Sequence, residues 1–440
     1  MTGAEESVDV AVQLLSELIR LDTSNPPGNE EVAVQFLESV LKKEGIKADI
    51  YAPQPKRANI LARLKGKRSG EPVVLLGHLD VVPATDEGWV EPPFSGAVRD
   101  GFIYGRGAID MKSQVICQLL SFIELHRAGI LPEQDIIFLA TADEETSGRL
   151  GVEYMLQKVE DLADASFVLS EGGSIVEEEG RLHAQVSVAE KKVCQFMIRA
   201  RGTGGHGSMP HKDNANDKVV RAANRIISSP SPVKPTKIVS RYLNGLLKGR
   251  KIGNVKFSSL KDALRNKSFS DFIDKSPVAN ALLRNTVTLT MLKSGEKVNV
   301  IPTESTAYFD ARILPDVSHE HFLAQVKRVA GREVEVLLAG RTDSIPSSFS
   351  TPYFRQVAKA VRKIKGEVPV LPFLTTGATD MRYFRNLGIT AYGFFPVTLT
   401  EEEHLRMHGV NERLSVKNLE EGLKGTREIV FALASYAASE

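Results

Sequence analysis

Apolar residues in the first part of the chain recur at two different spacings. Residues 8–20 and 30–43 have helical spacing, and the breaker Asn25-Pro26-Pro27-Gly28 separates them. Further on, short apolar runs typical of buried strands alternate with helical stretches: strands at 60–64, 73–76, 136–140 and 167–169, and helices at 111–128 and 152–158. This alternation predicts an α/β domain whose mostly parallel central sheet carries helices on both faces.

The pattern changes near residue 185 and changes back near residue 354. The intervening segment has alternating strands, a Gly-rich turn and amphipathic helices: strands at 186–188, 193–200, 286–292 and 305–313, the turn at 202–207, and helices at 214–227 and 318–329. A last helix is predicted at 416–437. We therefore expect a catalytic domain formed by 1–187 and 345–440. An α+β lid or dimerisation domain at 188–344 is inserted into it, with an extension at about 230–283.

Residues 230–270 combine three prolines with many basic residues: Lys248, Arg250, Lys251, Lys256, Lys261, Arg265 and Lys267. A basic stretch of this kind can bind nucleic acid. Here aspartates are interspersed and aromatic residues are few, so a solvated helical excursion of the inserted domain is the better interpretation.

Composition narrows the class of protein. The 440 residues are 42% hydrophobic and carry a formal net charge of +1, which allows a large core and gives no field that favours nucleic acid or an anionic membrane. Cys117 and Cys194 lie in apolar runs and are expected to be buried, reduced thiols. Without a basic leader or an apolar run of about 20 residues, the sequence predicts a soluble, cytoplasmic protein.

Histidine and carboxylate residues end or follow the predicted strands. His78 and Asp80 come directly after the run 73–76, and the two-residue period of a strand places both side chains on one side. A metal-bound histidine usually donates its other N–H to a carboxylate, which Asp80 would supply here, although a strand-end histidine can also be merely hydrogen bonded. Asp110 follows two glycines just before a helix, where it can cap the helix or bridge two ions with its two oxygens.

Two further strands end in acidic residues. Asp143, Glu144 and Glu145 are consecutive, and Glu171 follows the strand at 167–169. Adjacent carboxylates need a compensating cation unless they form a solvated turn. Because neighbouring side chains point in different directions, one glutamate can hold a metal while the next removes a proton from water. Oxygen and imidazole donors without thiolates suit Zn²⁺, Co²⁺ or Mn²⁺, and hydrolases of this kind hold two ions about 3.5–4 Å apart.

A second histidine ligand is expected from the C-terminal part. His404 and His408 have the i,i+4 spacing that chelates one ion on a helix, but Gly409 follows His408 directly and no HExxH signature occurs. We therefore favour His408 alone, presented by a loop.

Taken together, these segments resemble the M20 metallopeptidase family, which includes carboxypeptidase G2, aminoacylase-1, acetylornithine and succinyl-diaminopimelate deacylases and carnosinase-type dipeptidases. The matching motifs occur in family order along nearly the whole chain: GHLD (77–80), GRGAIDMK (105–112), DEETSG (143–148), SEGG (170–173), GHGSMP (205–210), NVIP (299–302) and HGVNE (408–412). Each motif alone is weak, but their order makes the resemblance specific.

The resemblance implies a role for each matching residue. One metal would be held by His78, Asp110 and Glu171, and the other by Asp110, Glu145 and His408. Glu144 would be the general base, and Asp80 would orient His78. In the inserted domain, His206 would polarise the scissile carbonyl, Asn299 and Arg312 would bind the substrate backbone and carboxylate, and Gly377 would line the same pocket. From the residues alone, Gly-His-Gly can equally be a tight turn and Arg312 a surface cation.

The implied function is a two-metal hydrolase, with zinc as the expected metal, that cleaves an amide or peptide bond beside a free carboxylate. Many family members have aspartate at the position of Glu171, and the SEGG form resembles the carboxypeptidase S branch and its relatives that process N-fatty-acyl amino acids. This favours hydrophobic N-acyl amino acids or short peptides as substrates. Cleavage of an N-carbamoyl or amidine bond, or a non-catalytic peptide-binding role, stays open. A homodimer through the inserted domain is also implied, although the longer insert can replace that contact.

Overall fold

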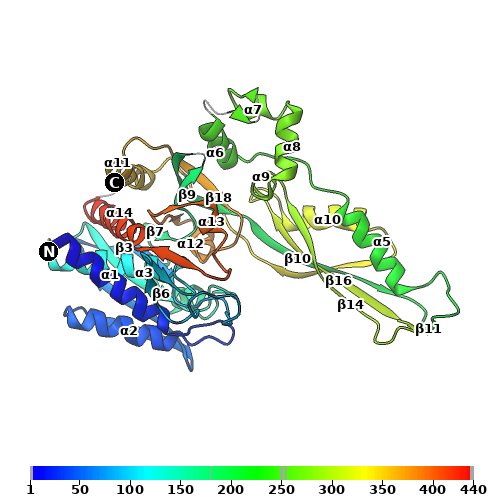
Figure 1. Ribbon diagram of the computed structural model, residues 1–440, viewed down its shortest axis with the longest axis horizontal. Coiled ribbons are helices and arrows are strands. Elements are labelled where there is room, and N and C mark those ends of the chain that lie inside the picture. The colour runs from blue at the N-terminus through cyan, green and yellow to red at the C-terminus, as the bar shows by residue number, and fades with distance from the viewer. Residues whose placement is uncertain (1–2, 179, 248–250, 253–254, 437–440) are drawn as a thin grey trace. The chain divides into compact units, whose positions relative to one another are not determined.

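The computed structural model describes residues 3–178, 180–247, 251–252 and 255–436, and the chain divides into two compact units (Figure 1). Unit 1 contains 1–188, 347–373 and 379–440, and unit 2 contains 189–346 and 374–378. The boundaries predicted from the sequence lie after 187 and 344, and that prediction includes 374–378 in the catalytic domain. Among the described residues, every helix is too short or too polar to cross a membrane.

Unit 1 contains one large sheet, a small three-stranded sheet and the helices that cover them. In chain order its elements are α1 (Gly3–Arg20), α2 (Glu30–Lys43), β1 (Ala48–Gln54), β2 (Arg57–Leu64), β3 (Arg68–His78), β4 (Val98–Arg99), β5 (Phe102–Tyr104), α3 (Lys112–Arg127), β6 (Gln134–Thr141), α4 (Val152–Lys158), the 3-10 turn η1 (Glu160–Leu162), β7 (Phe167–Ser170), β8 (Ile175–Glu178), β9 (Arg181–Glu190), α11 (Pro352–Lys365), β18 (Val370–Thr375), α12 (Met381–Asn386), β19 (Thr390–Gly393), β20 (Thr398–Leu399), α13 (Glu401–His404), β21 (Arg413–Ser415) and α14 (Val416–Ala434).

The large sheet has the strand order β1-β2-β6-β3-β7-β19-β9-β8-β20, and β18 also pairs with β9. Its centre, from β6 through β3 and β7 to β19, is parallel. The β1, β2 and β9 pairings on either side are antiparallel. Strands β6 and β7 are buried over their whole length and β3 is buried from Pro72 to His78, as expected for a sheet covered on both faces.

Helices cover both faces of this sheet. On one face, the strand residues Val74, Ile137 and Val168 share a buried cluster with α4 and α12. On the other face, the Phe138 ring lies 6.1 Å from that of Phe122 in α3, and α3 packs against α1 and α14. Burying one such aromatic side chain contributes about 2–3 kcal/mol, so the two layers hold the strand ends rigidly.

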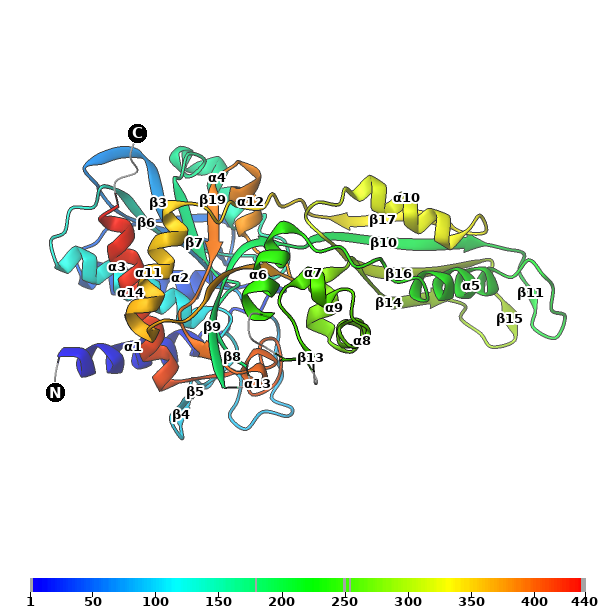
Figure 2. The same cartoon turned by 90° about the horizontal axis from the view of Figure 1, so that it is seen from above.

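Unit 2 is built on a four-stranded antiparallel sheet with the order β14-β16-β10-β17. Two helices, α5 and α10, pack on this sheet and on each other (Figure 2). In chain order the elements are β10 (Lys192–Arg201), β11 (Gly205–His206), α5 (Ala215–Ile227), α6 (Lys237–Leu247), β12 (Lys251–Ile252), β13 (Val255–Lys256), α7 (Leu260–Ala263), α8 (Lys267–Lys275), α9 (Pro277–Leu283), β14 (Thr286–Ser294), β15 (Val300–Ile301), β16 (Glu304–Ile313), α10 (His319–Ala330) and β17 (Glu335–Arg341).

The described part of the extension at 230–283 forms the short helices α6, α7, α8 and α9, in agreement with the helical-excursion interpretation, and also a two-stranded hairpin, β12-β13, that carries Lys251 and Lys256. Side-chain oxygens of Ser259, Asn266 and Ser276 cap the first turns of α7, α8 and α9. Phe257 and Phe269 pack together with ring centroids 5.8 Å apart. Of the basic residues named there, Lys248 and Arg250 lie outside the described residues.

Candidate metal centre

Two groups of potential ligands meet at Asp110. His78 Nε2 lies 3.1 Å from Asp110 Oδ1 and 3.7 Å from Glu171 Oε2. His408 Nε2 lies 3.1 Å from Asp110 Oδ2 and 3.4 Å from Glu145 Oε1. Within each group, one donor atom per residue lies within 4.8 Å of the others. Asp110 thus turns one oxygen to each histidine, which is the arrangement of a carboxylate between two cations.

The parallel centre of the large sheet explains why ligands distant in sequence come together. His78 ends β3, Glu145 follows β6 and Glu171 follows β7, and these three strands are neighbours. Carboxyl ends of parallel strands meet at one edge of the sheet, where ligands of α/β proteins bind. Asp110 precedes α3 at the same edge. His408 lies in a loop after α13, as predicted, and its φ is 60°.

The hydrogen bonds of His78 select its tautomer. Nδ1 lies 2.9 Å from the main-chain oxygen of Asp80. Because a carbonyl oxygen only accepts, Nδ1 must carry the proton. Nε2 faces the carboxylates of Asp110 and Glu171, and against the lowering effect of burial the charge of Glu171 raises the pKa of His78 well above its usual value. A metal ion bound at Nε2 would take the place of the proton there and supply the positive charge that the two carboxylates attract.

The electrostatics of the cluster also fit divalent cations. Burial, with the nearby charge of Asp110, raises the pKa of Glu171 to about 8. Burial and the charge of Glu171 raise the pKa of Glu144 well above its usual value. Hydrogen bonding to Asp110 and Glu145 raises the pKa of His408 to about 10. Oε1 of Glu145 is buried, with His408 Nε2 3.4 Å away. The carboxylates therefore need positive charge, and the histidine and oxygen donor set suits zinc-like ions.

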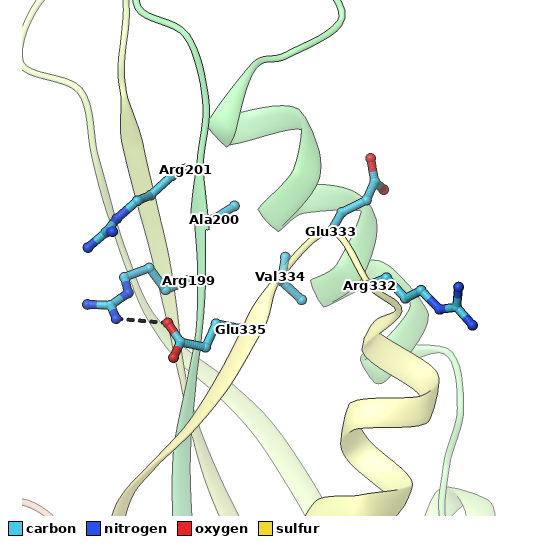
Figure 3. A pocket seen from close by; sticks show the side chains of 7 residues that line it. All are labelled: Arg199, Ala200, Arg201, Arg332, Glu333, Val334 and Glu335. Atoms are coloured by element: carbon cyan, nitrogen blue, oxygen red, sulfur yellow. Dashed lines mark hydrogen bonds and ion pairs between the residues drawn. The ribbon is translucent and has the colours of Figure 1, made fainter.

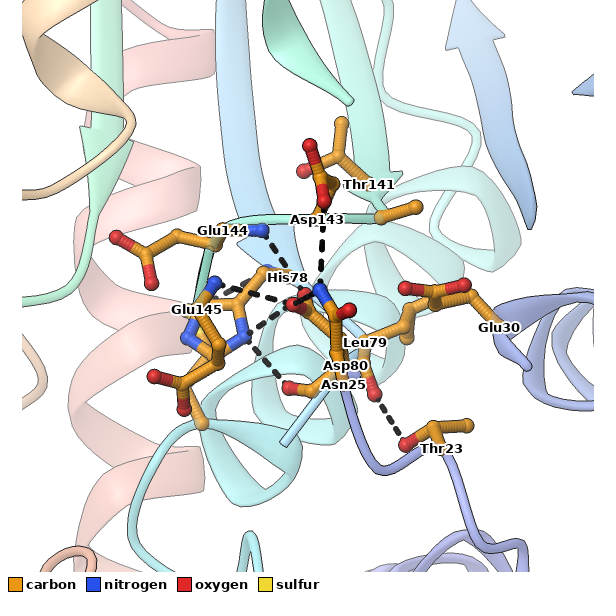
Figure 4. A network of polar contacts seen from close by, with 12 residues as sticks. Thr23, Asn25, Glu30, His78, Leu79, Asp80, Thr141, Asp143, Glu144 and Glu145 are labelled. Carbon is orange, nitrogen blue, oxygen red and sulfur yellow. Dashed lines mark hydrogen bonds and ion pairs between the residues drawn. The ribbon is translucent and has the colours of Figure 1, made fainter. Parts of the chain in front are cut away.

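Asp80 fixes the loop that carries the two glutamates (Figure 4). Its carboxylate accepts the main-chain N–H groups of Glu144 at 3.1 Å and Glu145 at 3.0 Å. The same carboxylate lies 3.6 Å from His78 Nδ1, so the main-chain oxygen of Asp80 makes the closer contact with the histidine. The predicted contact between the Asp80 carboxylate and His78 is thus the longer of the two, and the carboxylate instead holds the following glutamate loop in place.

A buried polar network behind this loop was missed by the sequence analysis. Asn25, treated there only as a helix breaker, donates to Asp80 Oδ2 at 2.9 Å and to Thr146 Oγ1 at 3.1 Å. Asp143 accepts from Arg57 at 3.2 Å, and Arg57 also pairs with the fully buried Glu30.

Asp380 was missed as well. It lies at the start of α12, is 3% exposed, and neither of its oxygens has a hydrogen-bond partner among the described residues. Burial raises its pKa to about 7, against the lowering effect of Arg382. It also contributes to the raised pKa of Glu144.

The remaining candidates lie in unit 2. His206, on β11, accepts the main-chain N–H of Ser208 at Nδ1, which leaves the ring proton on Nε2. Arg312, on β16, pairs with Asp310 at 3.0 Å. Asn299 is exposed, and its main-chain oxygen accepts the N–H of Gly207. Gly377 lies in the segment 374–378, with open space where a Cβ would be.

Two other features stay apart from the metal cluster. His404 Nε2 lies 3.2 Å from Ser174 Oγ, and the histidine belongs to neither ligand group. Figure 3 shows a hollow in unit 2 in which Arg199 pairs with Glu335; its lining residues are Arg199, Ala200, Arg201, Arg332, Glu333, Val334 and Glu335. Arg201 and Glu333 pair with Glu304 and Arg221, which do not line the hollow, and none of the predicted site residues lines it.

Comparison with known proteins agrees with this geometry. Residues 74–432 match the model of peptidase family M20/M25/M40. The chain is 32% identical over 381 residues to mouse N-fatty-acyl-amino acid synthase/hydrolase PM20D1, an alignment that covers 82% of this chain and 74% of the relative. It is 27% identical over 447 residues to rat aminoacylase-1A, covering 99% and 98% of the two chains.

Among solved structures, an M20 family metallo-carboxypeptidase from Sulfolobus solfataricus superposes with a TM-score of 0.75. The match covers 99% of this chain and all of that one, at 20% identity, so it supports the fold. The family model, which matches residues 74–432, and the mouse relative, at 32% identity, identify the family as well as the fold. The chain belongs to peptidase family M20/M25/M40.

Proposed function

We propose that the protein is a dinuclear metal-dependent hydrolase that cleaves an amide or peptide bond next to a free carboxylate. The observation that carries this proposal is the shared position of Asp110, whose two carboxylate oxygens each lie 3.1 Å from Nε2 of one histidine, His78 or His408. We assign His78, Asp110 and Glu171 to one ion and Asp110, Glu145 and His408 to the other. The donor set favours Zn²⁺, with Co²⁺ or Mn²⁺ as replacements.

When bound, the two ions would supply a water of lowered pKa and would polarise the scissile carbonyl. Glu144 lies beside the ligand Glu145 but belongs to neither ligand group, so its carboxylate is available as the general base. It would take a proton from water and return one to the leaving amine. Asp80 keeps this base in place through the main chain of the loop.

Residues of unit 2 would complete substrate recognition. His206 carries its proton on Nε2 and is therefore a hydrogen-bond donor for the oxyanion of the tetrahedral intermediate. Arg312 would bind the substrate carboxylate through its planar guanidinium, in exchange for part of its pairing with Asp310. From the family resemblance, we propose that Asn299 contacts the substrate backbone and that Gly377 lines the substrate pocket.

The substrate class follows from the relatives and from these residues together. The mouse relative is named for N-fatty-acyl amino acids and the archaeal one for carboxypeptidase activity. Both kinds of substrate carry a carboxylate next to the amide bond. We therefore propose N-acyl amino acids or short peptides with apolar acyl groups.

We also propose that the protein forms a homodimer through unit 2. The edge strand β14 of its sheet exposes large apolar side chains, among them Met291 at 48% and Leu292 at 59%. An unpaired strand edge of this kind is a template for pairing with a second chain.

A substrate panel tests the proposed reaction. Chelator-treated protein is reloaded with Zn²⁺, Co²⁺ or Mn²⁺ and assayed on N-acyl amino acids, dipeptides, N-carbamoyl amino acids and N-acyl amino acid amides. The last group differs from the first only by the blocked carboxylate. We expect turnover of the N-acyl amino acids or dipeptides and little turnover of the blocked amides. Preferential cleavage of N-carbamoyl substrates, or no turnover with any metal, would contradict the proposal.

A further inference from the structure

Glu412 is a fully buried carboxylate that contributes no atom to either ligand group. Its Oε1 accepts the main-chain N–H groups of Ile109 at 2.8 Å and Asp110 at 3.1 Å. Its Oε2 accepts the main-chain N–H of Gly107 at 3.1 Å and a guanidinium N–H of Arg106 at 2.7 Å. Both oxygens are thus occupied by the loop that presents Asp110.

The same contacts reach the loop of the second histidine. Arg106 donates from its other terminal nitrogen to the main-chain oxygen of His408, at 3.2 Å. The main-chain oxygen of Glu412 accepts the N–H of Gly105 at 2.9 Å. One face of the guanidinium lies against Trp89, with 5.5 Å between Arg106 Cζ and the ring centroid. Residues 105–110 and 408–412 are therefore joined by hydrogen bonds across about 300 positions of sequence.

A carboxylate is the group that this loop requires. The N–H groups of Gly107, Ile109 and Asp110 all donate to the one carboxylate of Glu412, and Gly107 reaches this conformation with a φ of 87°. Converging N–H groups form a site for an anion. Hydrogen bonds to an ionised acceptor are about twice as strong as neutral ones. Without Glu412 these N–H groups would be buried away from water with no acceptor, which is unfavourable.

We infer that Glu412 is a positioning residue that, with Arg106, sets the distance between the two metal ligands Asp110 and His408. This inference rests on the proposed function, because it takes those two residues as ligands. Asp110 belongs to both groups, so a shift of its main chain changes both sites at once. Losing Glu412 should therefore weaken metal binding although Glu412 touches no metal.

The test compares Glu412→Gln with a matched control, Asp135→Asn. The glutamine keeps the size of the side chain, but its NH₂ group must face N–H donors of Arg106 and Gly107 or of Ile109 and Asp110. Asp135 is likewise buried, at 1% exposure. It accepts the Gly66 N–H at 2.8 Å and pairs with Arg63 at 2.9 Å, away from the ligand loops. Both variants remove one buried charge from unit 1.

Two readouts are measured on chelator-treated protein: Zn²⁺ affinity by competition with a chromogenic chelator, and hydrogen exchange of amides 105–112. We expect Glu412→Gln to lower Zn²⁺ affinity by about tenfold or more, the usual size of such supporting contacts, and to speed exchange at 107, 109 and 110. We expect Asp135→Asn to stay within about twofold of the unmodified chain. Equal weakening in both variants, or unchanged affinity in Glu412→Gln, would overturn the inference.

A second variant decides the matter if Glu412→Gln does not fold. Arg106→Lys keeps the charge but cannot reach both the Glu412 carboxylate and the His408 carbonyl with a rigid fork. It should also lower Zn²⁺ affinity, and unchanged affinity would overturn the inference. Failure of the proposed function has a different signature: normal zinc affinity in the unmodified chain without any amide hydrolysis.

Discussion

The two nitrogens of His78 do different things. Nδ1 is committed to the main-chain oxygen of Asp80, and Nε2 faces Asp110 and Glu171. A histidine at a strand end was visible in the sequence, but its tautomer depends on a main-chain contact that side-chain patterns do not reveal. Likewise, Glu144 and Glu145 are adjacent residues of the same type, and only their surroundings in the fold show which of them can bind a metal. One meets His408, and the other stays outside both ligand groups.

Replacing the proposed base tests this division of roles. Glu144→Gln keeps the size of the side chain and leaves all proposed ligands intact, so the variant should retain its metal. It should lose about 10²–10⁴-fold or more in kcat, because glutamine cannot accept the proton. Metal content and steady-state kinetics measure the two effects separately, and near-normal turnover would refute the assignment.

Replacing Arg312 tests recognition of the carboxylate. Arg312→Ala should raise KM for N-acyl amino acids by about 10–100-fold, the loss expected for a charge-assisted contact of about 1.5–3 kcal/mol. The already weak hydrolysis of the corresponding blocked amides should not change. An equal loss on both substrate types would show that Arg312 supports the fold of unit 2 instead.

At the scale of elements, the sequence predicts the bounds of individual helices better than the order in which strands pair. The helices at 30–43 and 152–158 have the predicted bounds, because their apolar spacing and flanking glycines and prolines are local signals. The position of β19 between β7 and β9 was not predictable, because strand order depends on contacts between distant segments. Glu412 was hidden for the same reason: its partners lie about 300 residues away.

A buried lysine at the start of unit 2 gives a prediction for stability. Lys191, which follows β9, is fully buried and donates to the Arg284 main-chain oxygen at 2.9 Å and to Thr286 Oγ1 at 3.1 Å. Burial, with the charge of Arg312, lowers its pKa to about 7 from an ordinary value of 10.5. Between these pH values the unfolded chain holds this proton and the folded chain does not. The contribution of Lys191 to the free energy of unfolding therefore rises with pH over this range.

The comparison variant is Lys191→Met, which lacks the titrating group. Between about pH 7 and 10, the free energy of unfolding of the unmodified chain should rise relative to the variant, by up to about 1.4 kcal/mol per pH unit. Below about pH 7 the difference should level off. Urea unfolding of metal-free protein at several pH values measures it, and a difference independent of pH would contradict the lowered pKa.

At the scale of the whole molecule, the proposed work is divided between the two units. All proposed metal ligands and the base lie in unit 1, on segments before and after the insertion, whereas His206, Asn299 and Arg312 lie in unit 2. The chain must therefore leave unit 1 after β9 and return before His408 can join Asp110. This explains why the motifs of one metal centre are spread over more than 300 residues.

The central claim is that two bound ions and Glu144 together hydrolyse an amide bond beside a carboxylate. The most direct measurement is a Zn²⁺ titration of chelator-treated protein, with hydrolysis of an N-acyl amino acid followed at each step. The account predicts that activity reaches its maximum at two equivalents of Zn²⁺ per chain. It also predicts that Glu144→Gln binds the same two equivalents without turnover. Full activity at one equivalent, or two bound equivalents without any hydrolysis by the unmodified chain, would contradict it.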